Sequence, residues 1–419
     1  MTRTLYTLLL FLLLPLTPLK LLWRARKQPE YLHHWQERYG HYRIKITQPV
    51  IWLHCVSVGE TRAAVPLISA LLDAYPSHRI LLTHTTPTGR ATSEQIFGDK
   101  VARVYLPYDL PFAVKRFIQY FKPVVGVILE TELWFNLIAS CKQQTTPLLL
   151  VNARLSEKSA RGYAKLAKLT QDGLQALSAI AAQTDVDAER LQALGAKNIT
   201  ITGNLKFEVT PPDNAAQQGK LLRHSLGEKR PVFLAASTRE GEEEMILDAV
   251  CNTTVPDLLT VIVPRHPQRF DDVDALLKKR GFNYLRRSTL TDASAVGKEV
   301  KYILGDSMGE MFTYYAACDI AFIGGSLLPL GGQNLIEALR MGKPVLIGPH
   351  TFNFEQVCKL ATGAGAAIQV QDTTELTHHI NALFSHPSRQ KQMSQAAQSV
   401  GLANQGATAR TFKLIQPFI

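Results

Sequence analysis

The sequence predicts an α/β protein built from two doubly wound halves. From residue 50, short apolar runs alternate with stretches of helical periodicity, which is typical of βα units around a parallel sheet. Residues 206–218, "KFEVTPPDNAAQQ", interrupt this pattern with two prolines and several polar residues, and a second series of alternating runs then begins. The two series predict two Rossmann-like domains that face a ligand-binding cleft outside the carboxyl ends of their strands.

The composition favours a globular protein with an anionic partner. The chain has 419 residues, of which 46% are hydrophobic, enough for the cores of two domains. Its formal net charge of +11 favours a membrane surface or a phosphorylated substrate. Nucleic acid is disfavoured, because basic and aromatic residues do not interleave and no recognition motif is present. The five cysteines are widely spaced, which indicates buried thiols in a reducing compartment, and no metal-binding spacing occurs.

The N-terminal segment is a candidate membrane anchor. Residues 4–22 form an almost uncharged stretch, interrupted by Pro15, Pro18 and Lys20, and the cations Arg24, Arg26 and Lys27 flank its end. A cleaved signal peptide would carry a small-residue cleavage site, which is missing, so a buried helix of the globular body is the alternative. The basic flank predicts that the bulk of the protein lies on the cytoplasmic side.

The predicted strands define the domains. In the first half they are "VIWLHCVS", "RILLTHT", "ARVYLPY", "VVGVILE", "TPLLLVN", "LSAIAAQT" and "NITITGN". In the second half they are "PVFLAAS", "LLTVIVP", "VKYILGD", "DIAFIGG", "KPVLIGP" and "AAIQV". We therefore expect an anchor at 1–24, a first domain at 31–210, a second domain at 219–400 and a helical tail at 401–419 that crosses back onto the first half.

Three loops of the second half carry candidate nucleotide-binding residues. In "FIGGSLLPLGGQNLIEALRMGKP", two pairs of glycines precede a helix expected near Asn334. This loop either binds a phosphate or is a tight packing turn. Glu337 either accepts hydrogen bonds from ribose hydroxyls or is an exposed first-turn acid that the helix dipole favours. "VPRHPQRF" offers Arg265 and His266. In "GDSMGEMF", Asp306 or Ser307 either caps a helix or belongs to a loop that reads a base.

The first half places acids and a lysine after its strands. Glu130 and Glu132 lie in "ILETELWFN", where either is a functional candidate or the start of the next helix. Lys206 lies at the predicted domain boundary, where it is either a solvated linker residue or a cation held for a negative group.

Glu60 has two possible roles. Ser57 and Glu60 form the S-x-x-E pattern of a capping box, followed by apolar residues at helical spacing. Glu60 therefore serves either as a cap or as a base aimed into the cleft. The helix N-terminus would favour its ionised form. The sequence alone leaves both roles open.

The motifs together resemble one enzyme family from residue 31 onward. In order they are "SVGE", "TPTG", "YLPYDLP", "ETELW", "NARLS", "GNLKF", "PRHPQRF", "DSMGE", "GGS", "GGQN" and "GPHTFNF". Such a set is similar to the 3-deoxy-D-manno-octulosonic acid (Kdo) transferases of Gram-negative lipopolysaccharide synthesis. Gln333 and Leu335 stand where that family often has His and Pro, which affects only the detail of the phosphate loop.

The resemblance implies a GT-B fold and an inverting, metal-independent transfer. Kdo would pass from the co-substrate CMP-Kdo to lipid IVA, the tetraacyl precursor of lipid A, at the cytoplasmic side of the inner membrane, with no cofactor. Glu60 would be the general base, and Glu130 and Lys206 would stabilise the transition state. The residues implied to bind CMP are Arg265, His266, Asp306, Ser307, Met308, Gly309, Glu310, Gly331, Gly332, Gln333, Asn334 and Glu337.

Two other functions fit parts of the sequence. One is another GT-B nucleotide-sugar transferase or an epimerase, which would consume a UDP-sugar instead of CMP-Kdo. The other is a membrane-tethered nucleotide-sugar binding protein without turnover, which product formation on a lipid acceptor would exclude.

Overall fold

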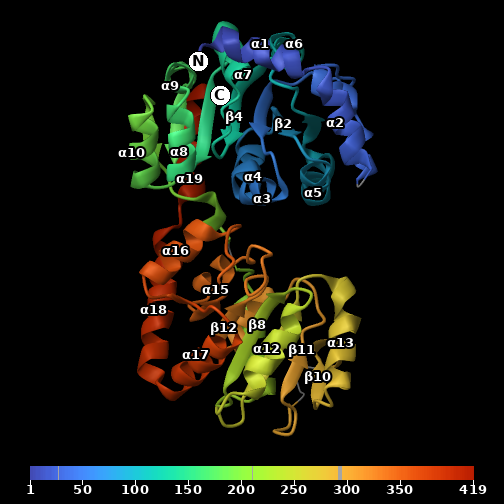
Figure 1. Ribbon diagram of the computed structural model, residues 1–419, viewed down its shortest axis with the longest axis vertical. Coiled ribbons are helices and arrows are strands. Elements are labelled where there is room, and N and C mark those ends of the chain that lie inside the picture. Colours follow the sequence, from blue (N-terminus) through green and yellow to red (C-terminus); the bar gives the residue numbers. More distant parts are fainter. Residues whose placement is uncertain (27, 210, 291–294) are drawn as a thin grey trace. The chain divides into compact units, whose positions relative to one another are not determined.

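A computed structural model of the protein describes residues 1–419 except 27, 210 and 291–294. The chain divides into two compact units (Figure 1): unit 1 contains residues 1–208 and 405–419, and unit 2 contains residues 209–404. The division falls inside the interruption seen in the sequence at 206–218. The predicted end of the first domain, residue 210, and one basic residue of the anchor flank, residue 27, lie outside the described residues.

Unit 1 contains a parallel seven-stranded sheet of the order β3-β2-β1-β4-β5-β6-β7. The order reverses between β1 and β4, which gives the doubly wound topology predicted from the alternation. The strands are β1 (Val50–His54), β2 (Arg79–His84), β3 (Ala102–Tyr105), β4 (Pro123–Leu129), β5 (Leu148–Ala153), β6 (Ala179–Ala182) and β7 (Ile199–Ile201).

Helices cover both faces of this sheet. They are α1 (Arg3–Leu13), α2 (Leu16–Ala25), α3 (Val58–Ala63), α4 (Val65–Ala74), α5 (Pro87–Phe97), α6 (Pro111–Phe121), α7 (Phe135–Gln143), α8 (Glu157–Ala164), α9 (Ala167–Gln175), α10 (Asp185–Ala193) and α19 (Ala407–Ile415). Short 3₁₀ turns are η1 (Pro29–Leu32), η2 (Trp35–Tyr39), η3 (Gly98–Lys100), η4 (Leu205–Phe207) and η7 (Gln416–Phe418).

The core of unit 1 is packed tightly at the centre of the sheet. Trp52 of β1 is fully buried and pairs in register with Gly126 of β4. A Cβ atom at residue 126 would approach the indole ring to 2.6 Å, so only glycine fits there. On the opposite face, Ala407 and Ile415 of α19 join the same apolar cluster as α4. The C-terminal tail therefore returns to the first half, as predicted.

Unit 2 contains a second seven-stranded sheet of the order β10-β11-β9-β8-β12-β13-β14, also parallel. Its strands are β8 (Val232–Thr238), β9 (Leu259–Pro264), β10 (Tyr284–Arg286), β11 (Tyr302–Leu304), β12 (Ile320–Ile323), β13 (Val345–Ile347) and β14 (Ala367–Gln369). The sequence analysis missed β10, because this edge strand has three residues, all only half-buried.

One helix of unit 2, α18, continues beyond residue 400, where the second domain was predicted to end. The helices of unit 2 are α11 (Ala215–Leu226), α12 (Glu242–Cys251), α13 (Phe270–Lys279), α14 (Met311–Ala317), α15 (Ile336–Arg340), α16 (Glu355–Gly363), α17 (Thr373–Ser385) and α18 (Pro387–Ala403), with 3₁₀ turns η5 (Pro267–Arg269) and η6 (Arg287–Thr289). The boundary expected between residues 400 and 401 is wrong. Helix α18 continues through it because Gly401 packs against the backbone of Leu339 in α15.

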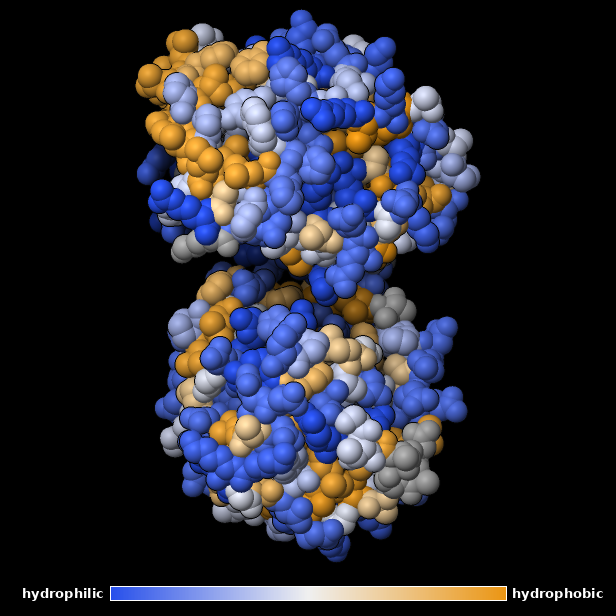
Figure 2. All heavy atoms as spheres, turned by 90° about the vertical axis from the view of Figure 1, so that its right-hand side faces the viewer, coloured by the Kyte–Doolittle hydropathy of each residue, from blue (hydrophilic) through white to orange (hydrophobic). Residues whose placement is uncertain are grey.

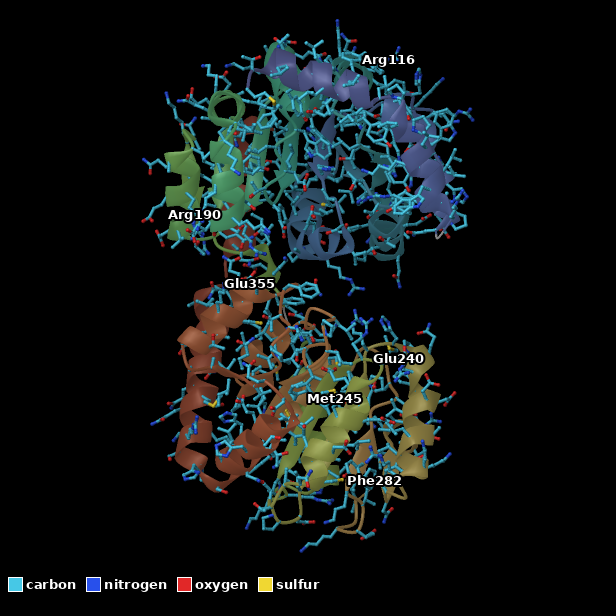
Figure 3. All side chains as sticks on the ribbon, in the orientation of Figure 1. Arg116, Arg190, Glu240, Met245, Phe282 and Glu355 are labelled. Atoms are coloured by element: carbon cyan, nitrogen blue, oxygen red, sulfur yellow. The ribbon has the colours of Figure 1, made fainter. Side chains whose placement is uncertain are left out.

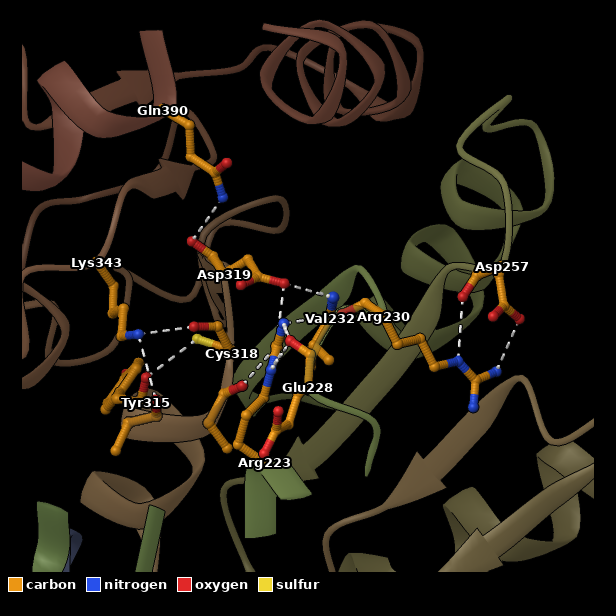
Figure 4. Close-up of polar contacts among 12 residues, drawn as sticks. Arg223, Glu228, Arg230, Val232, Asp257, Tyr315, Cys318, Asp319, Lys343 and Gln390 are labelled. Carbon is orange, nitrogen blue, oxygen red and sulfur yellow. Dashed lines mark hydrogen bonds and ion pairs between the residues drawn. The ribbon is translucent and has the colours of Figure 1, made fainter. Parts of the chain in front are cut away.

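The amino-terminal edge of the second sheet is held by a polar network (Figure 4). The carboxylate of Asp319 accepts hydrogen bonds from Arg223 at 3.1 Å and from the N–H of Val232 at 2.8 Å. Lys343 donates to the carbonyl of Cys318 at 2.7 Å, and Arg230 pairs with Asp257 at 3.5 Å. These groups bind one another across the strand ends, so their role is structural. The predicted functional residues of unit 2 lie at the opposite edge of the sheet.

The N-terminal segment forms two helices instead of the single anchor helix that we expected. Helices α1 and α2 meet at Pro15 with a bend of 57°. Proline lacks the N–H that a continuous helix needs, and its ring clashes with the preceding turn, so the break falls at this residue. No single helix among the described residues is long and apolar enough to cross a membrane, whereas the bent pair reaches the required length and composition.

Candidate active site

The carboxyl ends of the strands in unit 1 bring the predicted residues of the first half to one edge of the sheet. All strands of this sheet are parallel, so the loops that follow them lie at the same edge. Glu60 follows β1, Glu130 and Glu132 follow β4, and Lys206 lies in turn η4 after β7.

Glu60 lies in the first turn of helix α3, whose N-cap is Ser57. The Oγ atom of Ser57 accepts a hydrogen bond from the Glu60 N–H at 3.4 Å and donates to Glu60 Oε1 at 3.0 Å. The other oxygen, Oε2, accepts the N–H of Val56 at 2.7 Å. The capping box predicted from the sequence is therefore present, although the carboxylate binds the N–H before the cap residue instead of the N–H of Ser57 itself.

The electrostatic environment of Glu60 differs from the prediction. The helix N-terminus was expected to favour its ionised form, yet the pKa of Glu60 is raised to about 7. Burial is the main cause, and the charges of Glu130 and Glu132 act in the same direction, against the hydrogen bonds from Val56 and Ser57. The side chain is only 8% exposed, so loss of hydration outweighs the helix terminus. A carboxylate with this pKa is a much stronger base at neutral pH than an ordinary one.

Glu130 forms an ion pair with Lys206. The Nζ atom of Lys206 lies 3.1 Å from Glu130 Oε1, and both side chains are partly exposed. Glu130 has a φ of 57°, which is uncommon for a non-glycine residue, and its N–H donates to the carbonyl of Val151 at 2.9 Å. Strained backbone of this kind clusters at functional sites. Lys206 is therefore an ion-paired, partly exposed side chain and not a solvated linker residue.

Glu132 adds a second acid beside this pair. Burial raises its pKa, and the charge of Glu130 acts in the same direction. Both acids precede helix α7, which begins at Phe135, so neither lies in its first turn. The interpretation of either acid as a helix-start residue is therefore wrong.

Asn152 positions the turn that carries Lys206, a role that the sequence analysis missed. Asn152 lies one residue before the end of β5, has a φ of 53° and is fully buried. Its Oδ1 atom accepts the N–H of Leu205 at 3.0 Å, and Asn204 Oδ1 accepts the N–H of Lys206 at 2.9 Å. The signal was the asparagine at a strand end, since this residue type tolerates left-handed backbone.

In unit 2, Glu242 organises the first pair of glycines, and the sequence analysis missed it as well. Its carboxylate accepts the N–H groups of Gly325 at 2.5 Å, Ser326 at 3.0 Å and Leu327 at 3.0 Å. The side chain is fully buried. This part of the predicted phosphate loop therefore surrounds the carboxylate of Glu242. In the sequence, only the run of acids after β8 indicated this carboxylate.

The second pair of glycines has a left-handed backbone. Gly331 and Gly332 have φ values of 92° and 73°, and a Cβ atom at Gly331 would approach the side chain of Asn353 to 2.3 Å. The N–H of Gly332 donates to the Gly325 carbonyl at 2.7 Å, and that of Gln333 donates to the Gly324 carbonyl at 3.0 Å. These two N–H groups hold the loop together, as in a tight packing turn, and are therefore not available to a phosphate.

The helix after this loop begins where it was predicted. Helix α15 starts at Ile336, near Asn334, whose side chain accepts the Ile336 N–H at 3.0 Å. The same side chain donates to Glu337 Oε1 at 3.1 Å. Asn334 thus orients Glu337 at the start of the helix.

Arg265 and His266 gather positive charge at the carboxyl end of β9. The Nε atom of Arg265 donates to Gln333 Oε1 at 3.1 Å, which joins two of the predicted loops. Burial, together with the charges of Arg239 and Arg265, lowers the pKa of His266. Three basic side chains at one sheet edge suit an anionic ligand.

The "DSMGE" loop is held by ion pairs. Asp306 lies 3.2 Å from Arg286 and accepts the N–H of Ser288 at 2.8 Å. Glu310 lies 2.9 Å from Arg287. The two acids therefore fix the loop.

The helix-capping interpretation of this loop is wrong. Glu310 precedes helix α14 without a side-chain cap, and the Oγ atom of Ser307 bonds to Tyr314 Oη at 2.5 Å. Met308 is exposed and Gly309 has a φ of 82°. The exposed part of the loop is therefore Met308 and Gly309.

The fold defines a class of protein. Two doubly wound units of this kind form the GT-B fold, and a sequence family described as glycosyl transferases group 1 matches residues 276–400. MurG from Acinetobacter baumannii superposes with a TM-score of 0.57 at 12% identity, covering 88% of this chain and 99% of that one. UDP-GlcNAc 2-epimerase from Neisseria meningitidis, bound to UDP-GlcNAc, also reaches 0.57 at 15% identity, covering 87% and 99%.

Sequence relatives define the family within this class. The family described as 3-deoxy-D-manno-octulosonic-acid transferase (kdotransferase) matches residues 33–209. The 3-deoxy-D-manno-octulosonic acid transferase of Bordetella pertussis is 40% identical over 100% of both chains. That of Haemophilus influenzae is 38% identical over 100% of this chain and 99% of the relative. The protein therefore belongs to the 3-deoxy-D-manno-octulosonic acid (Kdo) transferase family of glycosyltransferases.

Proposed function

We propose that the protein transfers Kdo from CMP-Kdo to lipid IVA, the precursor of lipid A, in the synthesis of the lipopolysaccharide core. The observation that carries this proposal is the buried carboxyl group of Glu60, whose pKa is about 7, on the sheet edge that also holds the Glu130–Lys206 pair. In a Kdo transferase this group has the properties required of the base that activates a sugar hydroxyl.

The reaction is a direct displacement. Glu60 takes the proton of the acceptor hydroxyl, and the resulting oxygen attacks the ketosidic carbon of Kdo from the face opposite the CMP phosphate. The bond between that carbon and the phosphate oxygen breaks, and CMP leaves with the electron pair. A single displacement inverts the configuration at the ketosidic carbon, and Glu60 ends the step protonated.

Glu130 and Lys206 support the transition state. Positive charge develops at the ketosidic carbon as the phosphate departs, and a nearby carboxylate lowers its energy. The ion pair of 3.1 Å holds Glu130 in one orientation before the reaction begins, so little reorganisation is needed. The strained backbone of Glu130 is consistent with such a fixed position.

The CMP group binds at the carboxyl edge of unit 2. Arg265 and His266 face the departing phosphate, and the loop segment Ser307–Gly309 lies against the cytosine. Residues 331–334 with Glu337 bind the ribose and the phosphate. The charge at Arg239, which together with Arg265 lowers the pKa of His266, supports an anion in this place.

The transfer uses no metal ion and no cofactor. Arginine supplies the positive charge that the leaving phosphate needs, and His266, whose pKa is lowered, supplies an N–H donor. A chelator such as EDTA should therefore leave the rate unchanged, and loss of activity that Mg²⁺ restores would contradict this part of the proposal.

The protein acts at the cytoplasmic side of the inner membrane, anchored by its N-terminal segment. The net charge of +11 and the apolar helix pair α1–α2 support this location. A lipid acceptor would then be reached without leaving the membrane.

A second candidate is a GT-B enzyme that uses a UDP-sugar, because the epimerase from Neisseria meningitidis shares the fold. The test incubates purified full-length protein with lipid IVA and either CMP-Kdo or UDP-GlcNAc, and follows the mass of the lipid and the release of CMP. A gain of Kdo with stoichiometric CMP supports the proposal. Consumption of UDP-GlcNAc, or binding of CMP-Kdo without turnover, contradicts it.

A further inference from the structure

The two N-terminal helices contact unit 1 along one narrow stripe. The half-buried or buried residues of α1 and α2 recur every three or four positions across the bend at Pro15; they are Tyr6, Thr7, Leu10, Leu14, Thr17, Leu21 and Ala25. This spacing places them on one helical face. The stripe runs along nearly the whole length of the pair, so both helices lie flat against unit 1.

Polar bonds fix this arrangement at several points. Tyr6 Oη donates to Asp109 Oδ2 at 2.9 Å, and Asp109 also accepts the N–H of Leu137 in α7 at 2.8 Å. Thr7 Oγ1 donates to Asn136 Oδ1 at 2.9 Å. In the second helix, the hydroxyl groups of Thr17 and Tyr39 lie 2.8 Å apart. These bonds hold both helices to the body of unit 1.

The remaining surface of the pair is apolar and exposed (Figure 2). Half of the large exposed hydrophobic side chains among the described residues lie in these two helices; they are Leu5, Leu8, Leu9, Phe11, Leu12, Leu13, Leu16, Leu19, Leu22 and Trp23. They form the orange patch at the upper left of the space-filling view. A contiguous apolar patch of this size marks an interaction surface.

Basic side chains lie beside the patch. A groove of about 560 Å³ between α1, α6 and α7 is lined by Arg3 and Lys115 together with Leu8 and Phe11 of the patch. Arg116 of α6 stacks over Phe112 at 5.4 Å, and that ring lies 6.3 Å from the ring of Phe11 (Figure 3). Cations next to an exposed apolar face match the interface of a bilayer with anionic headgroups.

The geometry is incompatible with a spanning anchor. At 1.5 Å per residue each helix is about 16 Å long, whereas the hydrocarbon core of a bilayer is about 30 Å thick. Neither helix alone can cross the core, and the pair could cross it only by leaving unit 1 to be surrounded by acyl chains. Leaving unit 1 would expose the stripe and break the bonds to Asp109, Asn136 and Tyr39.

We propose that α1 and α2 form an in-plane anchor, which lies between unit 1 and an anionic membrane surface without crossing it. The stripe binds the protein, and the leucine face enters the boundary between headgroups and acyl chains. The inference rests on the membrane location given above and specifies how the anchor acts. It places both ends of α1–α2 on the same side of the membrane as the catalytic units.

The topology is tested by labelling a cysteine with a membrane-impermeant maleimide. Cys251 is the exposed cysteine, and the other four are buried, so Thr2→Cys in a Cys251→Ser background creates a single accessible thiol at the N-terminus. Full-length protein is bound to preformed vesicles of phosphatidylethanolamine and phosphatidylglycerol, and the parent with Cys251 is the control. An in-plane anchor predicts equal labelling of both proteins before detergent. Labelling of Thr2→Cys only after detergent overturns the proposal.

The bound surface is tested by Leu12→Glu, at the most exposed leucine of the patch, which is 75% exposed. The variant loses the apolar side chain that enters the membrane and gains a charge, so its partition coefficient onto these vesicles should fall at least about tenfold. Leu402→Glu, at an exposed leucine of unit 2, is the matched control and should leave it unchanged. Equal partition of the two variants overturns the proposal.

The transferase assay separates this inference from the proposed function. With an acceptor dispersed in detergent, the Leu12→Glu variant should transfer Kdo as fast as the parent, because Leu12 lies outside the site. A parent that fails to transfer Kdo but binds vesicles as predicted would contradict only the proposed function.

Discussion

At the scale of single residues, Glu60 shows that a cap and a base are compatible roles. One face of its carboxylate is bound by Ser57 and Val56, and these bonds fix its position. Its raised pKa comes from burial and from acids on another loop. The sequence predicted the cap because that motif is local. It gave the wrong sign for the pKa, because burial and the approach of Glu130 and Glu132 depend on the fold.

The pH dependence of transfer follows from this pKa. Glu60 must be deprotonated to act as a base, so kcat/KM should fall as the pH drops below about 7 and should level off above it. The measurement is the rate of CMP release across this range at subsaturating acceptor. An acidic limb near 4.5, the ordinary value for a glutamate, would contradict the environment described for Glu60.

Lys206 should matter for catalysis and little for stability. Lys206→Met leaves Glu130 without its cation, and kcat should fall by about 10²-fold, the effect of removing one preorganised charge. The thermal midpoint should change little, because a partly exposed pair contributes only about 0–1 kcal/mol. Lys168→Met, which removes the exposed pair with Asp172, is the control. Equal activity of the two variants would contradict the role of Lys206.

At the scale of elements, the loops after parallel strands were predictable, and their internal bonding was not. Buried strands appear in the sequence as apolar runs, so thirteen of the fourteen strands among the described residues could be found, whereas the half-buried edge strand β10 could not. The glycine-rich loop was identified from its composition. Its N–H groups bind Glu242, far away in the sequence, and no local pattern reveals such a partner.

Glu242 should position the loop without touching the substrate. Glu242→Gln keeps the shape but replaces one acceptor oxygen by a donor that faces backbone N–H groups. Each lost bond to a buried group costs about 1–3 kcal/mol. The thermal midpoint of unit 2 should drop, and KM for CMP-Kdo should rise more than kcat falls.

The control for this variant is Glu240→Gln, at the nearby exposed glutamate labelled in Figure 3. It should resemble the parent in both measurements. If Glu242→Gln had the midpoint and KM of Glu240→Gln, the loop would not depend on the buried carboxylate.

At the scale of the whole molecule, the division into two halves was predictable and the path of the ends was partly so. The proline-containing interruption predicted the boundary region, and the final apolar run predicted the return of the tail. The extent of α18 was missed because its end is set by packing against α15, and the bend between α1 and α2 was missed although Pro15 was visible.

The return of the tail should be necessary for the stability of unit 1. Ile415 of α19 is fully buried in the cluster it shares with α4. Ile415→Ala should lower the free energy of unfolding of unit 1 by about 2–5 kcal/mol, the range for a truncated core side chain. Leu402→Ala, at an exposed leucine, is the control in a denaturant titration. Equal midpoints would mean that α19 does not contribute to this core.

The central claim, that Glu60 is the catalytic base, is tested most directly by Glu60→Gln. Glutamine keeps the shape and can still cap α3, and it removes the cost of burying a charge, so the thermal midpoint should not fall. The measurement is the rate of Kdo transfer from CMP-Kdo to lipid IVA, with the midpoint of the same preparation. We predict a loss of at least about 10²-fold in kcat at an unchanged midpoint. Near-parental turnover would reduce Glu60 to a helix cap and would direct the search for the base to Glu132 or Glu130.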